Sequence, residues 1–248
     1  MIDIWSELGD QIVPIPIHGE LVRVVESQEQ VATNSLVDTF AEQDALENML
    51  EATKPASPAG LHYLLATPFR YPPLAHGSRF GGRFEPSLFY GSQSFTTAFA
   101  ETGYYRLLFW RGMRVPPPSG KYITQHTVFG VPYGTSNGLK LQDAPLTSYE
   151  KSLSSPIEYS VTQKLGTDMR DAGIEAFEYI SARDLDRGIN VALFTPDALG
   201  ANTPTYQEPW LCQTSGDAVS FYSKTDGRLY EYVVDNYVVD GVFPEPAV

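Results

Sequence analysis

The stretch SLFYGSQSFTTAFAETGYYRLLFW, residues 87–110, constrains the fold most because it joins a strand pattern directly to a helix pattern. Residues 87–91 form a short apolar run that ends on glycine, which predicts a strand. Ser94 is a typical helix N-cap, and apolar residues recur at helical spacing after it. We therefore expect a strand that leads within a few residues into a capped helix.

The rest of the chain continues this mixture of strands and helices. Strands are predicted over 18–27, 121–131, 173–181 and 189–195, helices over 28–54 and 157–172, and loop over 130–156. The run 61–67 is apolar and closed by Pro68, and a hairpin pattern surrounds Asp226–Gly227. We interpret residues 1–248 as a single α+β domain with a helical insertion at about 28–60 and a C-terminal β-hairpin at about 218–235.

Charge and cysteine content narrow the functional classes. The net charge of −13 argues against direct nucleic-acid binding by a general electrostatic surface. Cys212 is the single cysteine, so an internal disulfide is excluded, and we expect it to be a small buried apolar residue. The first residues lack a signal-peptide pattern, and no apolar run reaches the ~18 residues of a membrane span. These features favour a cytoplasmic protein without a membrane contact.

Six arginines fall within the 45 residues from Arg70 to Arg114 of this acidic chain. Such clustering indicates a local cationic pocket for a small anionic ligand, although exposed or ion-paired arginines are the ordinary alternative. Arg79 lies in the glycine-rich stretch GSRFGG, where backbone amides and a guanidinium are suited to phosphate oxygens. The stretch matches neither the P-loop pattern nor the dinucleotide-binding fingerprint, and it also fits a purely structural turn.

Tyr90 lies eleven residues after Arg79, and Glu101 lies eleven residues after Tyr90. A tyrosine at a strand end is usually core-lining, but it can also stack on a heterocycle or orient a substrate. A helix glutamate is usually solvated, but it can also stabilise positive charge that develops when a sugar–nitrogen bond breaks. Metal chemistry is not indicated, because the four histidines are scattered: His18, His62, His76 and His126.

The order of several short segments resembles the RES domain family. The segments are LVRVVESQ, PFRYPP, GSRFG, LFYGS, AFAE, YISARD and GINVALFTP, spread over roughly residues 20–200. The resemblance implies an ADP-ribosyltransferase-toxin-like fold with a mixed β-sheet core. It also implies the toxin of a bacterial toxin–antitoxin pair that destroys NAD⁺, by hydrolysis or with inorganic phosphate as co-substrate. The usual partner of such a toxin is an antitoxin with an Xre-like helix-turn-helix domain.

The resemblance also assigns residues. The family spacing fits Arg79, Tyr90 and Glu101, while Ser181 matches the family serine and Asn190 a frequent asparagine. These matches imply that Arg79 holds the pyrophosphate of NAD⁺, that Tyr90 packs against nicotinamide or its ribose, and that Glu101 stabilises the breaking bond. Ser181 and Asn190 would position ribose or phosphate by hydrogen bonds.

The family has one further arginine, before the glycine turn. Arg23 is the better match to this family arginine because it lies in a predicted strand, and Arg70 is the alternative. Whichever of the two corresponds to it would bind substrate beside Arg79. The turn departs from the family pattern Gly-Gly-Arg-Trp-Asn, since Gly-Ser-Arg-Phe-Gly stands here, and shorter members lack the insertion between Arg23 and Arg70.

Two alternative functions stay open at this stage. ADP-ribosyl transfer to a protein would use the same bond cleavage, but many transferases need a second glutamate two residues earlier, where Phe99 stands. A non-catalytic nucleotide-binding module is the other alternative, and the retained arginine, tyrosine, glutamate and serine argue against it. NAD⁺ would be a substrate, so no cofactor or metal is expected, and a homodimer is left open.

Overall fold

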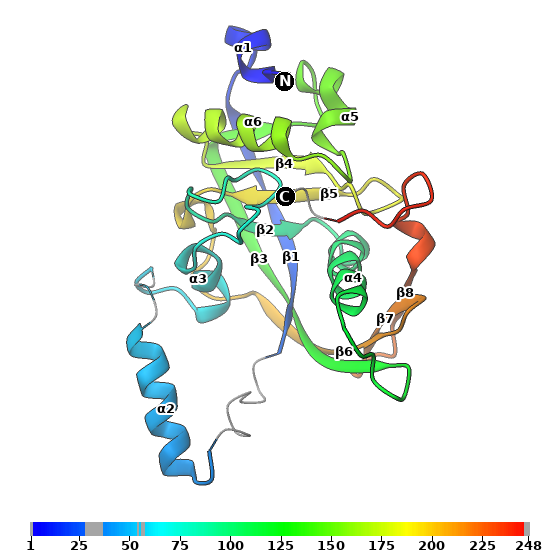
Figure 1. The fold of residues 1–248 in the computed structure, drawn as a ribbon. Coiled ribbons are helices and arrows are strands. Elements are labelled where there is room, and N and C mark those ends of the chain that lie inside the picture. The colour runs from blue at the N-terminus through cyan, green and yellow to red at the C-terminus, as the bar shows by residue number, and fades with distance from the viewer. Residues whose placement is uncertain (1, 28–36, 54, 56–57, 246–248) are drawn as a thin grey trace.

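The computed structural model describes residues 2–27, 37–53, 55 and 58–245. In this part of the chain one mixed sheet has eight strands in the order β1-β2-β5-β4-β3-β6-β7-β8. The α+β class predicted from the sequence is confirmed (Figure 1). The strands are β1 (Ile15–Glu26), β2 (Phe89–Ser92), β3 (Tyr122–Lys140), β4 (Ala176–Ile180), β5 (Ile189–Leu193), β6 (Tyr206–Thr214), β7 (Ala218–Ser223) and β8 (Leu229–Val233).

The first five strands in this order close into a ring, because β1 also pairs with β3 from Ile15 to Glu26. All neighbouring strands in the sheet are antiparallel except β3 and β4. One core cluster takes alternate residues from all five ring strands, including Leu21, Phe89, Phe129 and Val191, and these side chains fill the inside of the ring.

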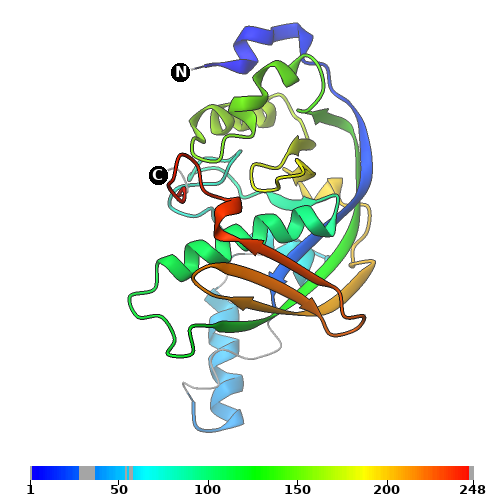
Figure 2. The ribbon, with the colours of Figure 1, turned by 90° about the vertical axis from the view of Figure 1, so that its right-hand side faces the viewer.

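The described part of the chain also contains six α-helices. They are α1 (Ile4–Leu8), α2 (Phe40–Thr53), α3 (Tyr63–Arg70), α4 (Phe95–Arg111), α5 (Glu150–Leu153) and α6 (Ser160–Asp171). Figures 1 and 2 show α4 crossing the sheet near β6 to β8, whereas α1 and α6 lie together at the opposite end, above β4. The core cluster under α4 is centred on Phe99 and Trp210. The core cluster under α1 and α6 is centred on Phe80 and Phe177.

Most of the predicted elements are present, with shifted ends. Ser94 caps α4 as expected, since its hydroxyl accepts a hydrogen bond from the Thr97 amide at 3.1 Å. Cys212 is buried, and β7 pairs with β8 on either side of Asp226–Gly227. Most of the apolar run 61–67 belongs to α3, which begins at Tyr63 and continues through Pro68 to Arg70.

The expected loop over 130–156 is wrong in two places, because β3 runs on to Lys140 and because a 3-10 turn at Leu146–Tyr149 leads into α5 at Glu150–Leu153. Glycines at 130, 134 and 138 give this stretch a low strand propensity, but its pairing with β1 overrides that propensity. The helix predicted over 28–54 is observed as α2 from Phe40, and residues 28–36 lie outside the described part of the chain.

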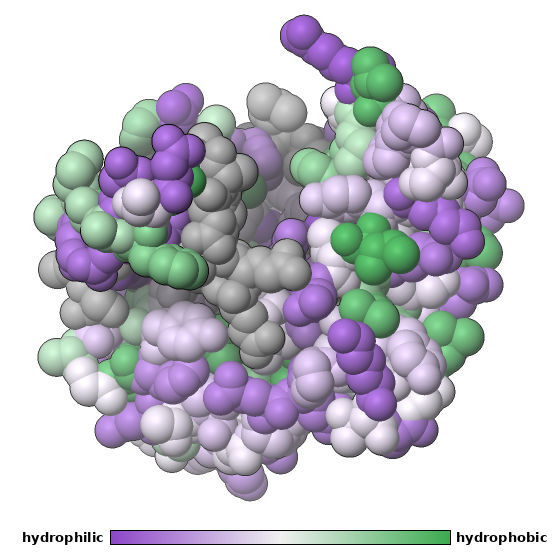
Figure 3. All heavy atoms as spheres, turned by 90° about the horizontal axis from the view of Figure 1, so that it is seen from below, coloured by the Kyte–Doolittle hydropathy of each residue, from purple (hydrophilic) through white to green (hydrophobic). Residues whose placement is uncertain are grey.

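Helix α2 projects away from the sheet in both ribbon views (Figures 1 and 2). Seen from below, the surface is mostly hydrophilic, and its hydrophobic residues are scattered (Figure 3). Within the described residues, none of the helices has the length and apolar character that crossing a bilayer requires.

Candidate active site

The turn that carries Arg79 is closed by its own backbone. The Ser78 amide donates to the Gly81 carbonyl at 2.8 Å, and these two residues form an isolated β-bridge. Gly77 has φ +73°, and a Cβ there would come within 2.4 Å of the Gly81 oxygen. A side chain at position 77 is therefore excluded, which explains the glycine at this point of the sequence.

Tyr90 holds this turn in place from β2. Its hydroxyl accepts a hydrogen bond from the Phe80 amide at 3.2 Å and shares another with the Ser78 hydroxyl at 2.9 Å. Burial raises the pKa of Tyr90 to about 12, so the phenol stays protonated at neutral pH. The ring packs against the core cluster around Phe80. The contacts of Tyr90 within the protein are thus with the turn and the core, and a contact of its ring with nicotinamide or its ribose stays a prediction.

The Arg79 guanidinium is directed towards the segment before α6. Nη1 donates to the Ser155 carbonyl at 2.6 Å, and Nη2 reaches the Tyr159 hydroxyl at 3.5 Å. The guanidinium carbon lies 4.5 Å from the centre of the Tyr159 ring, and Arg79 is only 8% exposed. Arg79 is therefore a buried cation held by a carbonyl and an aromatic face.

Glu101 on α4 receives two short hydrogen bonds on the same carboxylate oxygen. The Ser181 hydroxyl and the Asn190 side-chain amide each donate to Oε1 at 2.6 Å. Oε2 forms no hydrogen bond with any residue that the structure describes. The carboxylate is thus oriented through one oxygen, and its other oxygen is available to a ligand.

The hydrogen-bond directions at Ser181 are fixed by its neighbours. Ser181 follows β4, and its oxygen accepts the backbone amides of Arg183 and Asp184, both at 3.1 Å. With two donors already on the oxygen, the hydroxyl proton points to Glu101. Ser181 is 2% exposed, so water does not compete for this proton.

Asn190 is oriented in the same way by the sheet. It pairs with Ser92 across β2 and β5, and the Ser92 hydroxyl donates to the Asn190 carbonyl oxygen at 2.6 Å. The amide nitrogen of Asn190 is therefore the end that faces Glu101. The structure thus brings together three of the predicted residues, Glu101, Ser181 and Asn190, through direct contacts.

Neither Arg79 nor Tyr90 has a hydrogen bond to Glu101, Ser181 or Asn190, but the charges of Glu101 and Arg79 both act on Tyr179 of β4. Burial raises the pKa of the Tyr179 hydroxyl well above its usual value; the charge of Glu101 raises it further, and the charge of Arg79 lowers it. A connection not predicted from the sequence is Arg183. Its side chain donates to the Tyr159 hydroxyl at 3.2 Å, the same hydroxyl that Arg79 reaches. The sequence feature that could have indicated Arg183 is its position in YISARD, two residues after Ser181.

Arg23 lies apart from this group. Its Nη1 donates to the Tyr90 carbonyl at 2.6 Å, and its guanidinium lies 4.8 Å from the centre of the Phe89 ring. Phe89 belongs to the core inside the ring of strands, whereas the Tyr90 side chain lies on the other face. Arg23 thus approaches β2 from the side opposite to the Tyr90 ring.

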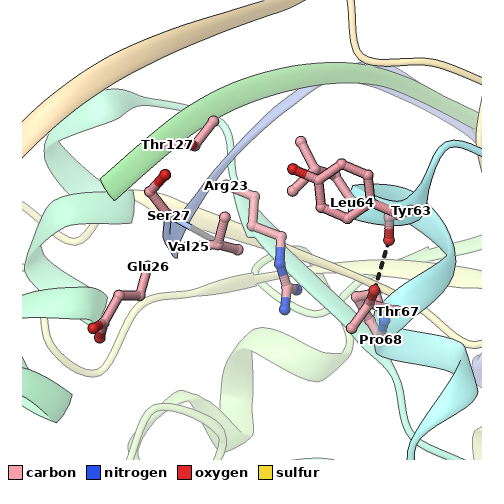
Figure 4. Close-up of a pocket in the computed structure, with 9 residues that line it drawn as sticks. All are labelled: Arg23, Val25, Glu26, Ser27, Tyr63, Leu64, Thr67, Pro68 and Thr127. Atoms are coloured by element: carbon pink, nitrogen blue, oxygen red, sulfur yellow. Dashed lines mark hydrogen bonds between the residues drawn. The ribbon is translucent and has the colours of Figure 1, made fainter. Parts of the chain in front are cut away.

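Arg23 also lines a cavity of about 60 Å³ between β1 and α3 (Figure 4). Burial lowers the pKa of Arg23 to about 10, and its Nε is buried without a partner. Arg70, the rival, donates from Nε to the Pro55 carbonyl and lies 6.0 Å from the Tyr71 ring centre. Neither arginine contacts Arg79 or Glu101. The cavity residues are Arg23, Val25, Glu26, Ser27, Tyr63, Leu64, Thr67, Pro68 and Thr127.

Comparison with known proteins gives one family. Residues 54–214 match the family model described as RES domain, which is more than half of the 248 residues. The matched range includes Arg79, Tyr90, Glu101, Ser181 and Asn190, and it begins after Arg23. A search of curated proteins gave no match.

Proposed function

This chain belongs to the RES domain family, and from that premise we propose that it degrades NAD⁺ by breaking the bond between nicotinamide and ribose. The observation that carries the proposal is the Glu101 carboxylate, which Ser181 and Asn190 orient through Oε1 while Oε2 has no hydrogen-bond partner among the described residues. A carboxylate fixed in this way is suited to stabilise positive charge on a ribose as a leaving group departs.

The proposed reaction needs no cofactor. The electron pair of the bond between ribose C1′ and the pyridinium nitrogen leaves with nicotinamide, which becomes neutral, and the ribose gains oxocarbenium character. Oε2 of Glu101 stabilises this charge, and water or inorganic phosphate then attacks C1′. Water gives ADP-ribose and a proton, whereas phosphate gives ADP-ribose phosphorylated at that same C1′. NAD⁺ is consumed as a substrate in both cases.

The other residues position the substrate and the carboxylate. Tyr90 holds the turn through Ser78 and Phe80, and Arg79, as a buried cation, contacts the pyrophosphate. Arg23 and Arg70 stay candidates for a second phosphate contact. Neither contacts Arg79, so each would bind the substrate at a different point from Arg79.

The family also suggests a biological role. We propose that the chain is the toxin of a toxin–antitoxin pair, that it acts on the NAD⁺ pool of the cytoplasm, and that an Xre-like helix-turn-helix antitoxin restrains it. The net charge of −13 suits a basic partner such as a DNA-binding antitoxin.

Incubation of the purified chain with NAD⁺, with and without phosphate, tests the reaction. Mass spectrometry should find nicotinamide with ADP-ribose, or with its phosphorylated form when phosphate is the attacking group. Intact NAD⁺ at the end of the incubation would overturn the enzymatic proposal and leave a nucleotide-binding module.

ADP-ribosyl transfer to a protein is the second candidate. It finds less support, because Phe99, at the position of the second transferase glutamate, is fully buried in the core under α4. NAD⁺ labelled in the ADP-ribose part separates the two activities. Label that stays on protein would favour the transferase, and label that is recovered as free ADP-ribose would favour the proposed hydrolysis.

A further inference from the structure

Two buried arginines meet at one phenol beside the Glu101 group. Nη2 of Arg79 lies 3.5 Å from the Tyr159 hydroxyl, and Nη2 of Arg183 lies 3.2 Å from it. Arg79 is 8% exposed and Arg183 is 4% exposed. Two guanidiniums share this hydroxyl oxygen, so positive charge is concentrated at a point that is largely removed from water.

No carboxylate neutralises these two cations within the described part of the chain. Aromatic faces support them instead. Arg183 lies 3.5 Å from the centre of the Tyr104 ring, and Arg79 lies 4.5 Å from that of Tyr159. Tyr104 is itself fixed, since its other neighbours include a stacked Phe243 ring at 5.4 Å. Stacking occupies the face of a guanidinium and leaves the N–H groups along its edge for an anion.

The edges of both guanidiniums face backbone carbonyls, and one nitrogen of Arg183 has no acceptor. Arg79 donates to the Ser155 carbonyl at 2.6 Å, and Arg183 donates to the Pro156 carbonyl at 2.9 Å. Nη1 of Arg183 is buried and has no hydrogen-bond partner. Neutral carbonyl oxygens are weaker acceptors for charged donors than phosphate oxygens are, and a buried donor without any partner is destabilising. The segment 155–158 that supplies the carbonyls is partly or fully exposed, so it can give way to a stronger acceptor.

We propose that Arg79, Arg183 and the Tyr159 hydroxyl bind the diphosphate of the dinucleotide, whose oxygens replace the carbonyls of Ser155 and Pro156. The inference rests on the proposed function and deepens it, because it assigns Arg183 as the second phosphate-binding cation. Arg183 is two residues from Ser181, whose hydroxyl contacts Glu101. A diphosphate held here therefore lies next to the carboxylate that would act on the neighbouring ribose.

Calorimetric binding of three probes to the full chain tests the site without turnover. ADP-ribose and inorganic pyrophosphate carry the diphosphate, and adenosine lacks it. Arg183→Gln should weaken ADP-ribose and pyrophosphate about 10- to 100-fold, the range expected for lost charge-assisted hydrogen bonds, and should leave adenosine unchanged. Arg187→Gln is the matched control, because Arg187 is exposed and pairs with Glu150; it should bind all three probes like the wild type.

Unchanged ADP-ribose affinity in a folded Arg183→Gln chain would overturn the inference. If that variant does not fold, Tyr159→Phe removes only the shared hydroxyl and should weaken pyrophosphate at least threefold; wild-type affinity there would equally refute the site. The outcomes separate this inference from the proposed function. If the chain leaves NAD⁺ intact but Arg183→Gln weakens pyrophosphate binding, the diphosphate site is supported and the enzymatic proposal is refuted. If the chain consumes NAD⁺ and Arg183→Gln leaves KM unchanged, the enzymatic proposal is supported and the diphosphate site is refuted.

Discussion

Glu101→Gln is the sharpest test of the proposed chemistry, because the structure indicates that it removes charge with little change of shape. Ser181 and Asn190 both donate to Oε1. The carbonyl oxygen of glutamine can accept both bonds, and its NH₂ group then stands where Oε2 stood. The substituted side chain should therefore keep its position and lose only the negative charge that faces the substrate.

The expected effect on rate follows from that charge. A unit negative charge about 4 Å from a developing positive charge contributes ~4 kcal/mol at an effective dielectric constant of ~20. Its removal should slow NAD⁺ cleavage about 10³-fold. The effect on folding should be smaller, because two hydrogen bonds to a charged acceptor become bonds to a neutral one, which lowers the free energy of unfolding by about 1–3 kcal/mol.

The assay is the initial rate of nicotinamide release from saturating NAD⁺, measured with the urea unfolding curve of the same preparation. Glu231→Gln is the control, because Glu231 is exposed on β8 and contacts Ser220 at 3.0 Å; its rate should equal that of the wild type. A folded Glu101→Gln chain that releases nicotinamide at the wild-type rate would refute the role of Glu101.

Two further predictions concern stability. Gly166→Ala should lower the free energy of unfolding by about 1–3 kcal/mol, because a Cβ at Gly166 would lie 1.9 Å from the Phe80 carbonyl oxygen in the Arg79 turn. Gly112→Ala, whose nearest contact would be 3.5 Å, should leave it unchanged in urea unfolding, and an equal stability of both variants would contradict the clash. His126→Phe should make the free energy of unfolding less sensitive to acid. Burial, the larger cause, and the charge of Arg106, the smaller one, lower the pKa of His126 to about 4. The unfolded chain binds a proton below about pH 6.5 that the native chain does not bind, so the wild type should lose up to about 3 kcal/mol as the pH falls from 6.5 towards 4. His18→Gln, at an exposed position, should keep that loss in thermal unfolding at pH 7, 6 and 5, and an identical loss in His126→Phe would refute the assignment.

Local signals were enough to predict the elements around the site. The Ser94 cap, the apolar spacing after it and the β-prone run before it all act within a few residues, and α4 and β2 follow them. The ring of strands was not predictable in the same way. It depends on β3 pairing with β1 through a glycine-containing stretch up to Lys140, and the partner that stabilises this stretch lies about a hundred residues earlier in the chain.

The candidate site, like the fold, could be predicted only in part. The spacing of Arg79, Tyr90 and Glu101 could be read from the sequence, and so could Ser181 and Asn190 through the family resemblance. The contacts of Tyr90 with the turn, and the shared hydroxyl between Arg79 and Arg183, could not be read. These depend on how the segments at 78–81 and 155–159 meet, which no periodicity or propensity encodes.

The register between β2 and β5 decides whether Glu101 has its partners at all. Ser92 lies opposite Asn190, and this pairing turns the Asn190 amide nitrogen to the carboxylate. A shift of the pairing by one residue would set Val191 opposite Ser92, and the side chain of Asn190 would then face the inside of the ring. The apolar residues Val191 and Leu193, which fill that interior, oppose such a shift because it would take them out of the interior and place Asn190 there instead. The packing of the ring thus stabilises the register on which the orientation of the carboxylate depends.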